Sequence, residues 1–314
     1  MKTVFLFPGQ GAQYPGMGKD LWEKSASVKE LFRLASGVTG CDMQKLLFEG
    51  SAEELKATDK TQGAITLANL SAAAFLREQG IVPNAAAGFS LGEYAALVTA
   101  GVIGAEAVFS LVKFRGEVME KASRALDTPE GSPGMAAVMG LDLPDVRKAL
   151  ESAGITDVYA ANYNSPVQTV VSGSPAALAA AETALKAAGA RRCIRLAVSG
   201  PFHSPLLADA RKAFEAELAK YSFADPAIPV FSNVTGKIIA SGDEAKRLAG
   251  EQITTPVLWV DIEKNIQAGG YERILEVGPG TVLAGLWKAL YADPVCRSAG
   301  TAEAIERAIY AGQG

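Results

Sequence analysis

The chain has 314 residues, of which 49% are hydrophobic and 20% charged, and its formal net charge is -4. This balance excludes a disordered, collagen-like or disulfide-stapled chain, and no stretch interleaves basic with aromatic residues as a nucleic-acid-binding face does. We therefore expect no nucleic-acid partner. The three cysteines are scattered, which favours a reducing compartment, and no run of ~18 consecutive apolar residues or signal-like leader occurs. These features predict a cytoplasmic protein with no membrane partner. The composition includes a single histidine, His203.

Strand and helix signals alternate in the first 122 residues. β-Branched and aromatic residues end at Pro8-Gly9-Gln10-Gly11, which predicts a strand that leads into a glycine-rich loop. A capping-box pattern, Ser51-Ala-Glu-Glu54, precedes a long helical segment. The predicted elements are a strand over 3–7, a helix over 61–78, a strand over 84–89, and helices over 91–100 and 104–122. This alternation predicts a mostly parallel sheet that is covered on both faces.

The pattern changes between residues 127 and 198. The predicted elements there are a strand over 135–139, a helix over 144–153, strands over 157–162 and 167–172, a helix over 175–188 and a strand over 192–198. That order, β-α-β-β-α-β, is typical of a ferredoxin-like unit. We therefore expect a small domain at 127–198, inserted into a large domain formed by 1–126 and 199–314. Beyond it we predict helices over 204–219, 242–251 and 256–268, and strands over 229–232 and 273–277.

Gly88-Phe89-Ser90-Leu91-Gly92 matches the G-x-S-x-G pattern of a nucleophile elbow, and it lies between a predicted strand and a predicted helix. The turn is too tight for side chains at the flanking positions, hence the glycines. The Leu91 amide at the helix N-terminus is placed to stabilise an oxyanion, and Gln10 in the first glycine-rich loop is a source of a second amide. The alternative is that Ser90 only caps the helix.

A serine nucleophile needs a base, and His203 is the one imidazole that could serve. It lies in Ser199-Gly-Pro-Phe-His203-Ser-Pro205, a loop before a predicted helix. The alternative is an ordinary surface or core histidine.

Arg115 lies on the apolar face of its predicted helix, with Val108, Leu111, Val112, Val118 and Met119 at helical spacing around it. A guanidinium there is costly unless it is paired. It could extend to solvent or pair with an internal carboxylate such as Glu93. The sharper hypothesis is that it is a two-pronged donor for a carboxylate on the substrate.

Taken together, these motifs resemble the malonyl-CoA:acyl-carrier-protein transacylases over nearly the whole chain. The segments that carry the resemblance are Pro8–Gln13, Gly88–Tyr94, Arg115, Asn162–Pro166, Gly200–His203, Gln252–Trp259 and Glu276–Gly280. The family often has histidine where Phe89 stands, so this chain lacks one polar group beside the nucleophile. Phe202, before His203, resembles the family's malonyl-preferring pattern.

The resemblance implies an α/β fold: a large hydrolase-like domain with a mostly parallel sheet and a nucleophile elbow, an inserted ferredoxin-like small domain, and the active site between them. The implied roles are Ser90 as nucleophile, His203 as base, Gln10 and Leu91 as oxyanion hole, Arg115 and Asn162 as substrate-binding residues, and the Gln252 carbonyl as the group that orients His203.

The implied activity is ping-pong transfer of a malonyl group from malonyl-CoA to the phosphopantetheine thiol of acyl carrier protein, through a malonyl-serine, for fatty-acid synthesis. We expect no cofactor, because malonyl-CoA is a substrate, and we expect a monomer. An acidic carrier would dock on Arg191, Arg192 and Arg195.

Two rival functions differ from this one. A serine esterase or thioesterase would place its histidine late, after an Asp or Glu, whereas here a long segment follows His203. A carrier-docking scaffold without activity would have no need of Ser90, His203 and Arg115 together.

Overall fold

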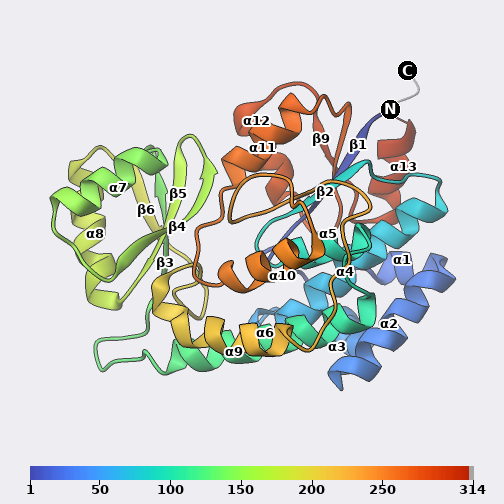
Figure 1. The fold of residues 1–314 in the computed structure, drawn as a ribbon, viewed down its shortest axis with the longest axis horizontal. Coiled ribbons are helices and arrows are strands. Elements are labelled where there is room, and N and C mark those ends of the chain that lie inside the picture. Colours follow the sequence, from blue (N-terminus) through green and yellow to red (C-terminus); the bar gives the residue numbers. More distant parts are fainter. Residues whose placement is uncertain (311–314) are drawn as a thin grey trace.

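A computed structural model describes residues 1–310, which form two separate sheets (Figure 1). The larger sheet is parallel throughout, with the strands in the order β7 (Val230–Phe231), β2 (Ala85–Gly88), β1 (Thr3–Phe7), β8 (Arg273–Glu276) and β9 (Cys296–Ser298). The smaller sheet is antiparallel, in the order β4 (Val158–Ser165), β5 (Gln168–Gly173), β3 (Gly134–Met139) and β6 (Arg192–Arg195). The predicted fold class is confirmed.

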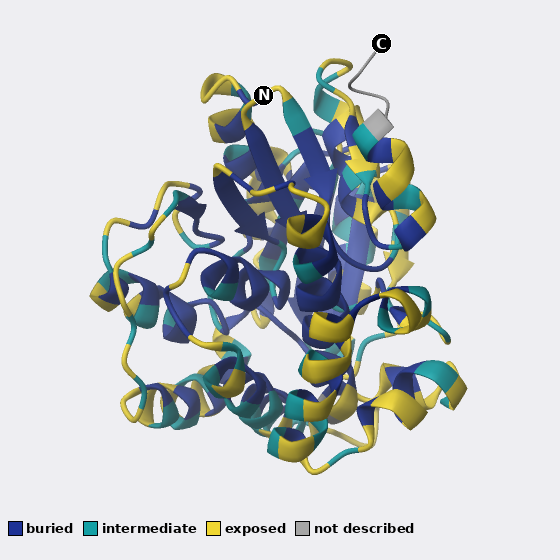
Figure 2. Ribbon diagram, turned by 90° about the vertical axis from the view of Figure 1, so that its right-hand side faces the viewer, coloured by how far each residue is buried: buried dark blue, intermediate teal, exposed yellow. Residues whose placement is uncertain are grey.

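Helices cover both faces of the larger sheet. The helices outside the smaller sheet's unit, of which α3, α9 and α10 pack mainly on other helices, are α1 (Lys19–Lys24), α2 (Ala26–Thr39), α3 (Met43–Glu49), α4 (Thr58–Glu78), α5 (Gly92–Thr99), α6 (Ala105–Arg124), α9 (Ala208–Leu218), α10 (Gly242–Glu251), α11 (Trp259–Ala268), α12 (Val282–Leu290) and α13 (Ala302–Tyr310). In β1, Phe5 and Phe7 pack into one core while Val4 and Leu6 pack into another, so both faces of the strand are buried. Figure 2 shows buried central strands surrounded by helices whose outer faces are exposed. A parallel sheet requires this double cover.

The smaller sheet is built in the predicted order β-α-β-β-α-β, with α7 (Leu143–Ser152) and α8 (Pro175–Ala187) as its helices. Both helices pack on the outer face of this sheet (Figure 1), where Val138 and Val171 form part of a separate small core. The opposite face points toward the large sheet. The elements run from Gly134 to Arg195, and the limits 127–198 stay a prediction.

Several predicted boundaries differ from the structure. The strand expected to continue to residue 198 ends at Arg195; Leu196 donates one more backbone bond, to the Met135 carbonyl at 2.9 Å, and Leu196 and Val198 line a cavity. The helix expected over 204–219 is divided into a 3-10 turn at Pro205–Leu207 and α9. Ser51 and Glu54 do form the reciprocal capping bonds, but they precede only a 3-10 turn, Glu54–Lys56. The C-terminal α12, β9 and α13 had no sequence prediction.

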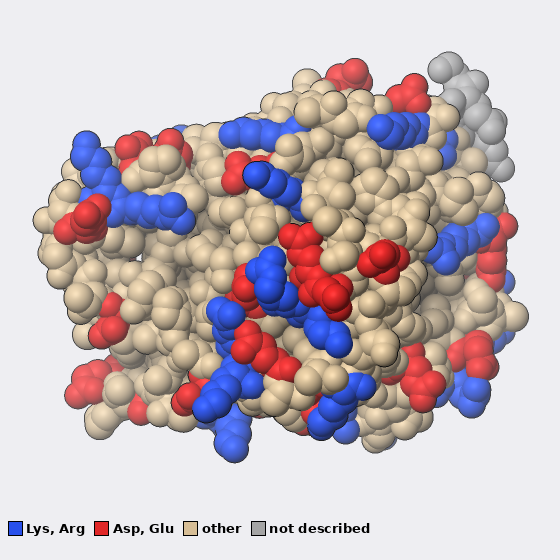
Figure 3. All heavy atoms as spheres, in the orientation of Figure 1, with Lys and Arg blue, Asp and Glu red and all other residues tan. Residues whose placement is uncertain are grey.

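Basic and acidic side chains are interspersed over the face of the molecule shown in Figure 3. On α9, Arg211 pairs with Glu215 at 2.7 Å, and on α10, Arg247 pairs with Glu251 at 2.8 Å. Within residues 1–310, every helix is too short or too polar to cross a lipid bilayer.

Candidate active site

The parallel register of β1 and β2 brings two loops together. Phe7 pairs with Gly88, so the loops that follow these residues leave the same edge of the sheet side by side. One loop carries Gln10 and the other carries Ser90. Gly9 permits this approach, because a Cβ on it would overlap the Phe89 carbonyl.

Ser90 sits in a strained turn, with φ of 50°. A Cβ on Gly88 would overlap the backbone of Gly92, and a Cβ on Gly92 would overlap the Phe7 carbonyl. Both glycines are therefore required by close backbone packing, as the motif predicts. The turn holds the Ser90 side chain at the N-terminal end of α5.

His203 lies against Ser90, on a loop where its own φ is 56°. Its Nδ1 is 2.8 Å from the Gln252 carbonyl oxygen, and its Nε2 is 2.7 Å from Ser90 Oγ. A carbonyl can only accept, so Nδ1 carries the proton and donates it, and Ser90 Oγ donates to the Nε2 lone pair. Burial and the Arg115 charge lower the pKa of His203 to about 4, so the imidazole is neutral at pH 7.

Two backbone N–H groups beside Ser90 are unoccupied. Within residues 1–310, the amides of Leu91 and Gln10 have no hydrogen-bond acceptor. Both residues line the same cavity as Ser90 and His203, with a volume of about 200 Å³. This arrangement suits an oxyanion.

Arg115 is buried, with 1% of its surface exposed, and it lines the same cavity. Its Nη1 donates to Gln62 Oε1 at 2.9 Å and its Nη2 to Gln252 Oε1 at 3.1 Å, while its Nε has no partner. Burial rules out the solvent-extended alternative. The Glu93 charge acts on Arg115, but the guanidinium donates its hydrogen bonds to the two amide oxygens and lies 5.5 Å from the centroid of the Tyr94 ring. A guanidinium has five N–H donors, so several remain for a ligand.

The small sheet supplies the other wall of the cavity. Asn162 lies there, and its predicted role in substrate binding stays a prediction; the other lining residues on this wall, which the prediction did not include, are Asn164, Gln168, Val170, Met135 and Leu196. Side chains two apart on a strand share a face, so Asn164 could have been found from its spacing to Asn162 on β4, whereas Gln168 lies on β5. The segment after Gln252 joins this wall, because Val257 donates to the Ala161 carbonyl at 2.9 Å.

Sequence reasoning also missed Asn233 and Gln62. Asn233 Oδ1 accepts from the Ser90 backbone N–H at 2.7 Å. It follows β7, and ligand-binding residues of parallel sheets gather beyond the carboxyl ends of the strands, which is the signal that was available. Phe89 packs edge-on against Trp259, with 5.4 Å between ring centroids.

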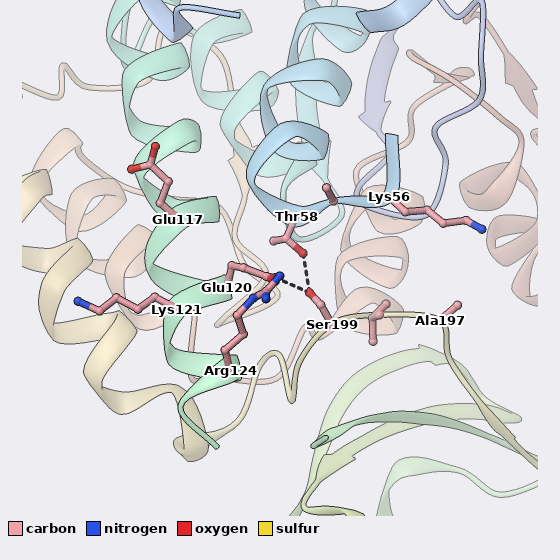
Figure 4. A pocket seen from close by; sticks show the side chains of 10 residues that line it. Lys56, Thr58, Glu117, Glu120, Lys121, Arg124, Ala197 and Ser199 are labelled. Carbon is pink, nitrogen blue, oxygen red and sulfur yellow. Dashed lines mark hydrogen bonds and ion pairs between the residues drawn. The ribbon is translucent and has the colours of Figure 1, made fainter. Parts of the chain in front are cut away.

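A second cavity of about 750 Å³ adjoins the first, and Val198 lines both. In it the Thr58 hydroxyl lies 2.6 Å from the Ser199 hydroxyl, which donates to Glu120 at 2.8 Å (Figure 4). Lys56 and Lys121 extend in opposite directions from this cavity (Figure 4), so their charges do not converge on one point.

Comparison with known proteins identifies the family. Residues 4–309 match the family described as "Acyl transferase domain". The malonyl CoA-acyl carrier protein transacylase of Escherichia coli strain K12 is 41% identical over 289 residues, which are 91% of this chain and 92% of that protein. The chain belongs to the malonyl-CoA:acyl-carrier-protein transacylase family. It is therefore an acyltransferase, as the sequence resemblance implied.

Solved structures agree with this assignment. A malonyl CoA-acyl carrier protein transacylase from Clostridium perfringens superposes with a TM-score of 0.94 at 35% identity, covering 100% of this chain and 98% of that one. A malonyl-transacylase solved in complex with the acyl-carrier protein of a type II polyketide synthase superposes with a TM-score of 0.93 at 35% identity. The match covers 99% of this chain and 100% of that one.

Proposed function

We propose that the chain transfers a malonyl group from malonyl-CoA to the phosphopantetheine thiol of an acyl carrier protein, through a malonyl-serine at Ser90, and so supplies extender units for fatty-acid synthesis. One observation carries the proposal: a Ser90–His203 pair and a buried arginine, Arg115, line one cavity. Relatives that are named for the same substrates support it.

In the first half-reaction, His203 Nε2 takes the Ser90 proton as Ser90 Oγ bonds to the thioester carbonyl carbon. The carbon–sulfur bond then breaks, and the coenzyme A sulfur leaves with the proton from His203. The Gln252 carbonyl holds the Nδ1–H throughout and stabilises the imidazolium. The carrier thiol reverses these steps in the second half-reaction.

The amides of Leu91 and Gln10 stabilise the oxyanion in both halves. One such donor contributes about 3–4 kcal/mol to the transition state. Because both are backbone groups fixed by the β1–β2 register, they need no rearrangement when charge develops.

Arg115 selects a dicarboxylic acyl group. Its uncommitted N–H donors bind the free malonyl carboxylate, while Gln62 and Gln252 hold the guanidinium in place. An acetyl group offers no such partner. Asn162, on the opposite wall, contacts the substrate.

The proposed reaction uses side-chain and backbone groups alone, without a cofactor. We further propose that the chain acts as a cytoplasmic monomer, and that exposed Arg191, Arg192 and Arg195 meet an acidic carrier surface. Added salt should then slow transfer to the carrier more than transfer to a small thiol. Equal salt dependence would remove this docking role.

A transfer assay tests the function. The protein is mixed with malonyl-, methylmalonyl- or acetyl-CoA and a holo-carrier protein, and acyl-carrier and free acid are quantified. We expect malonyl-carrier to form faster than free malonate and faster than the other two acyl-carriers. Faster release of malonate would favour the thioesterase alternative, and no acyl-enzyme or transfer would favour the scaffold.

A further inference from the structure

Glu93 is a buried carboxylate that the proposed steps do not use. It lies in the first turn of α5 with 1% of its surface exposed. Its Oε2 accepts from the Asn233 backbone N–H at 2.7 Å and also from the Asn233 side-chain Nδ2. Burying a charge is costly, so a carboxylate at this position calls for a reason.

Asn233 connects Glu93 to the nucleophile. Its Nδ2 also donates to the Gly88 carbonyl at 2.6 Å, and its Oδ1 accepts from the Ser90 N–H at 2.7 Å. The Asn233 Nδ2 thus faces two acceptors, the Gly88 carbonyl and Glu93 Oε2. This orientation of the amide turns Oδ1 toward the Ser90 N–H. Through these two bonds Asn233 holds the strained turn in which Ser90 has a φ of 50°.

Gln252 forms a second branch. Its carbonyl accepts from His203 Nδ1, its Nε2 donates to the Ser90 carbonyl at 3.1 Å, and its Oε1 accepts from Arg115. The Gln252 side chain also interacts with Glu93 and favours its ionised form. One carboxylate therefore adjoins both amides that hold the reacting pair.

The charge state of Glu93 is finely balanced. Burial raises its pKa to about 7, against the opposing effects of hydrogen bonds from Asn233 and Gln252 and the charge of Arg115 on α6. Tyr94 on α5 is the other titratable group whose charge is coupled to that of Glu93, and burial keeps its phenol neutral by raising its pKa. When the proton lies on Oε1, Oε2 still accepts both Asn233 bonds, but the bonds lose the negative charge that makes them roughly twice as strong as neutral ones.

We propose that Glu93 is a positioning residue which, as a carboxylate, holds Ser90 through Asn233 in the geometry for acyl transfer. The inference rests on the proposed acyl transfer at Ser90. It predicts that the reacting pair is aligned above neutral pH and loosened below it.

The test compares Glu93→Gln, Asn233→Ala and the double variant with the wild-type chain. Single-turnover acylation by malonyl-CoA is measured from pH 5.5 to 8.5, alongside labelling by a fluorophosphonate, which reports serine reactivity without a malonyl group. Glu263→Gln is the matched control, because Glu263 is also fully buried and accepts from Trp259 at 2.8 Å.

We expect the wild-type acylation rate to rise through an apparent pKa near 7, well above the value of about 4 for His203. Glu93→Gln should be about 10- to 100-fold slower at pH 8 and show no such rise. The KM should change less than kcat. The double variant should lose less than the product of the two single losses, since both changes break the Glu93–Asn233 connection.

An unchanged rate and pH profile in Glu93→Gln, or additive losses in the double variant, would overturn the inference. If Glu93→Gln does not fold, Asn233→Ala must itself lower the rate and flatten the pH profile. If the wild type accepts no malonyl group, the proposed function fails, while fluorophosphonate labelling still decides the role of Glu93.

Discussion

The two walls of the active-site cavity are built differently. On the large-domain wall, hydrogen bonds join Ser90, His203, Gln252 and Arg115 into one network. On the small-sheet wall, Asn162 and its neighbours make no side-chain hydrogen bond to that network within the described part of the chain. The difference indicates that the large domain holds the reacting groups rigidly, while the small sheet supplies shape and contacts to the substrate.

The largest effect should follow from His203→Ala, which removes the base from the large-domain wall. We expect Ser90 acylation to fall about 10²- to 10⁴-fold, since a positioned base contributes that much and the chain has no second imidazole. Single-turnover kinetics with malonyl-CoA measure this loss. A variant with wild-type acylation would leave the Ser90–His203 pair without support.

Arg115→Ala should have the next largest effect, and it should depend on the substrate. Losing charge-assisted bonds to the malonyl carboxylate costs about 3 kcal/mol, or about 10²-fold in malonyl transfer. Acetyl transfer should fall much less. A thermal melt controls for the buried Gln62 and Gln252, which lose their donor. Equal losses for both acyl groups would show that the arginine is structural.

Asn162→Ala, on the small-sheet wall, should have the smallest effect. Removing one neutral hydrogen bond to the substrate costs about 0.5–1.5 kcal/mol, or roughly 2- to 10-fold in malonyl transfer. Tyr163→Phe is the control on the same strand, because Tyr163 is not among the residues that line the cavity. A loss as large as that of His203→Ala would place essential chemistry on the small sheet and erase the contrast between the walls.

The features of the two walls that depend on local sequence could be predicted. The nucleophile elbow needs only two glycines near Ser90, and the ferredoxin-like order follows from short periodic segments, so both were predictable. Gln62 was not, because it reaches Arg115 through packing between elements far apart in the chain, and the position of Asn233 after β7 indicated a place near the site but not its bond to Ser90. The same limit explains Arg115: the sequence allowed a partner in Glu93, whereas folding brought two glutamine amides to the guanidinium.

In the proposed reaction Ser90 carries the malonyl group, and peptide mapping of the acylated protein tests this assignment. The protein is mixed with malonyl-CoA, quenched, digested and analysed by mass spectrometry, with Ser90→Ala as the control. We predict that the malonyl group is found on the peptide that contains Ser90 and is absent from the control. A malonyl group on another residue, or one retained in Ser90→Ala, would contradict the account.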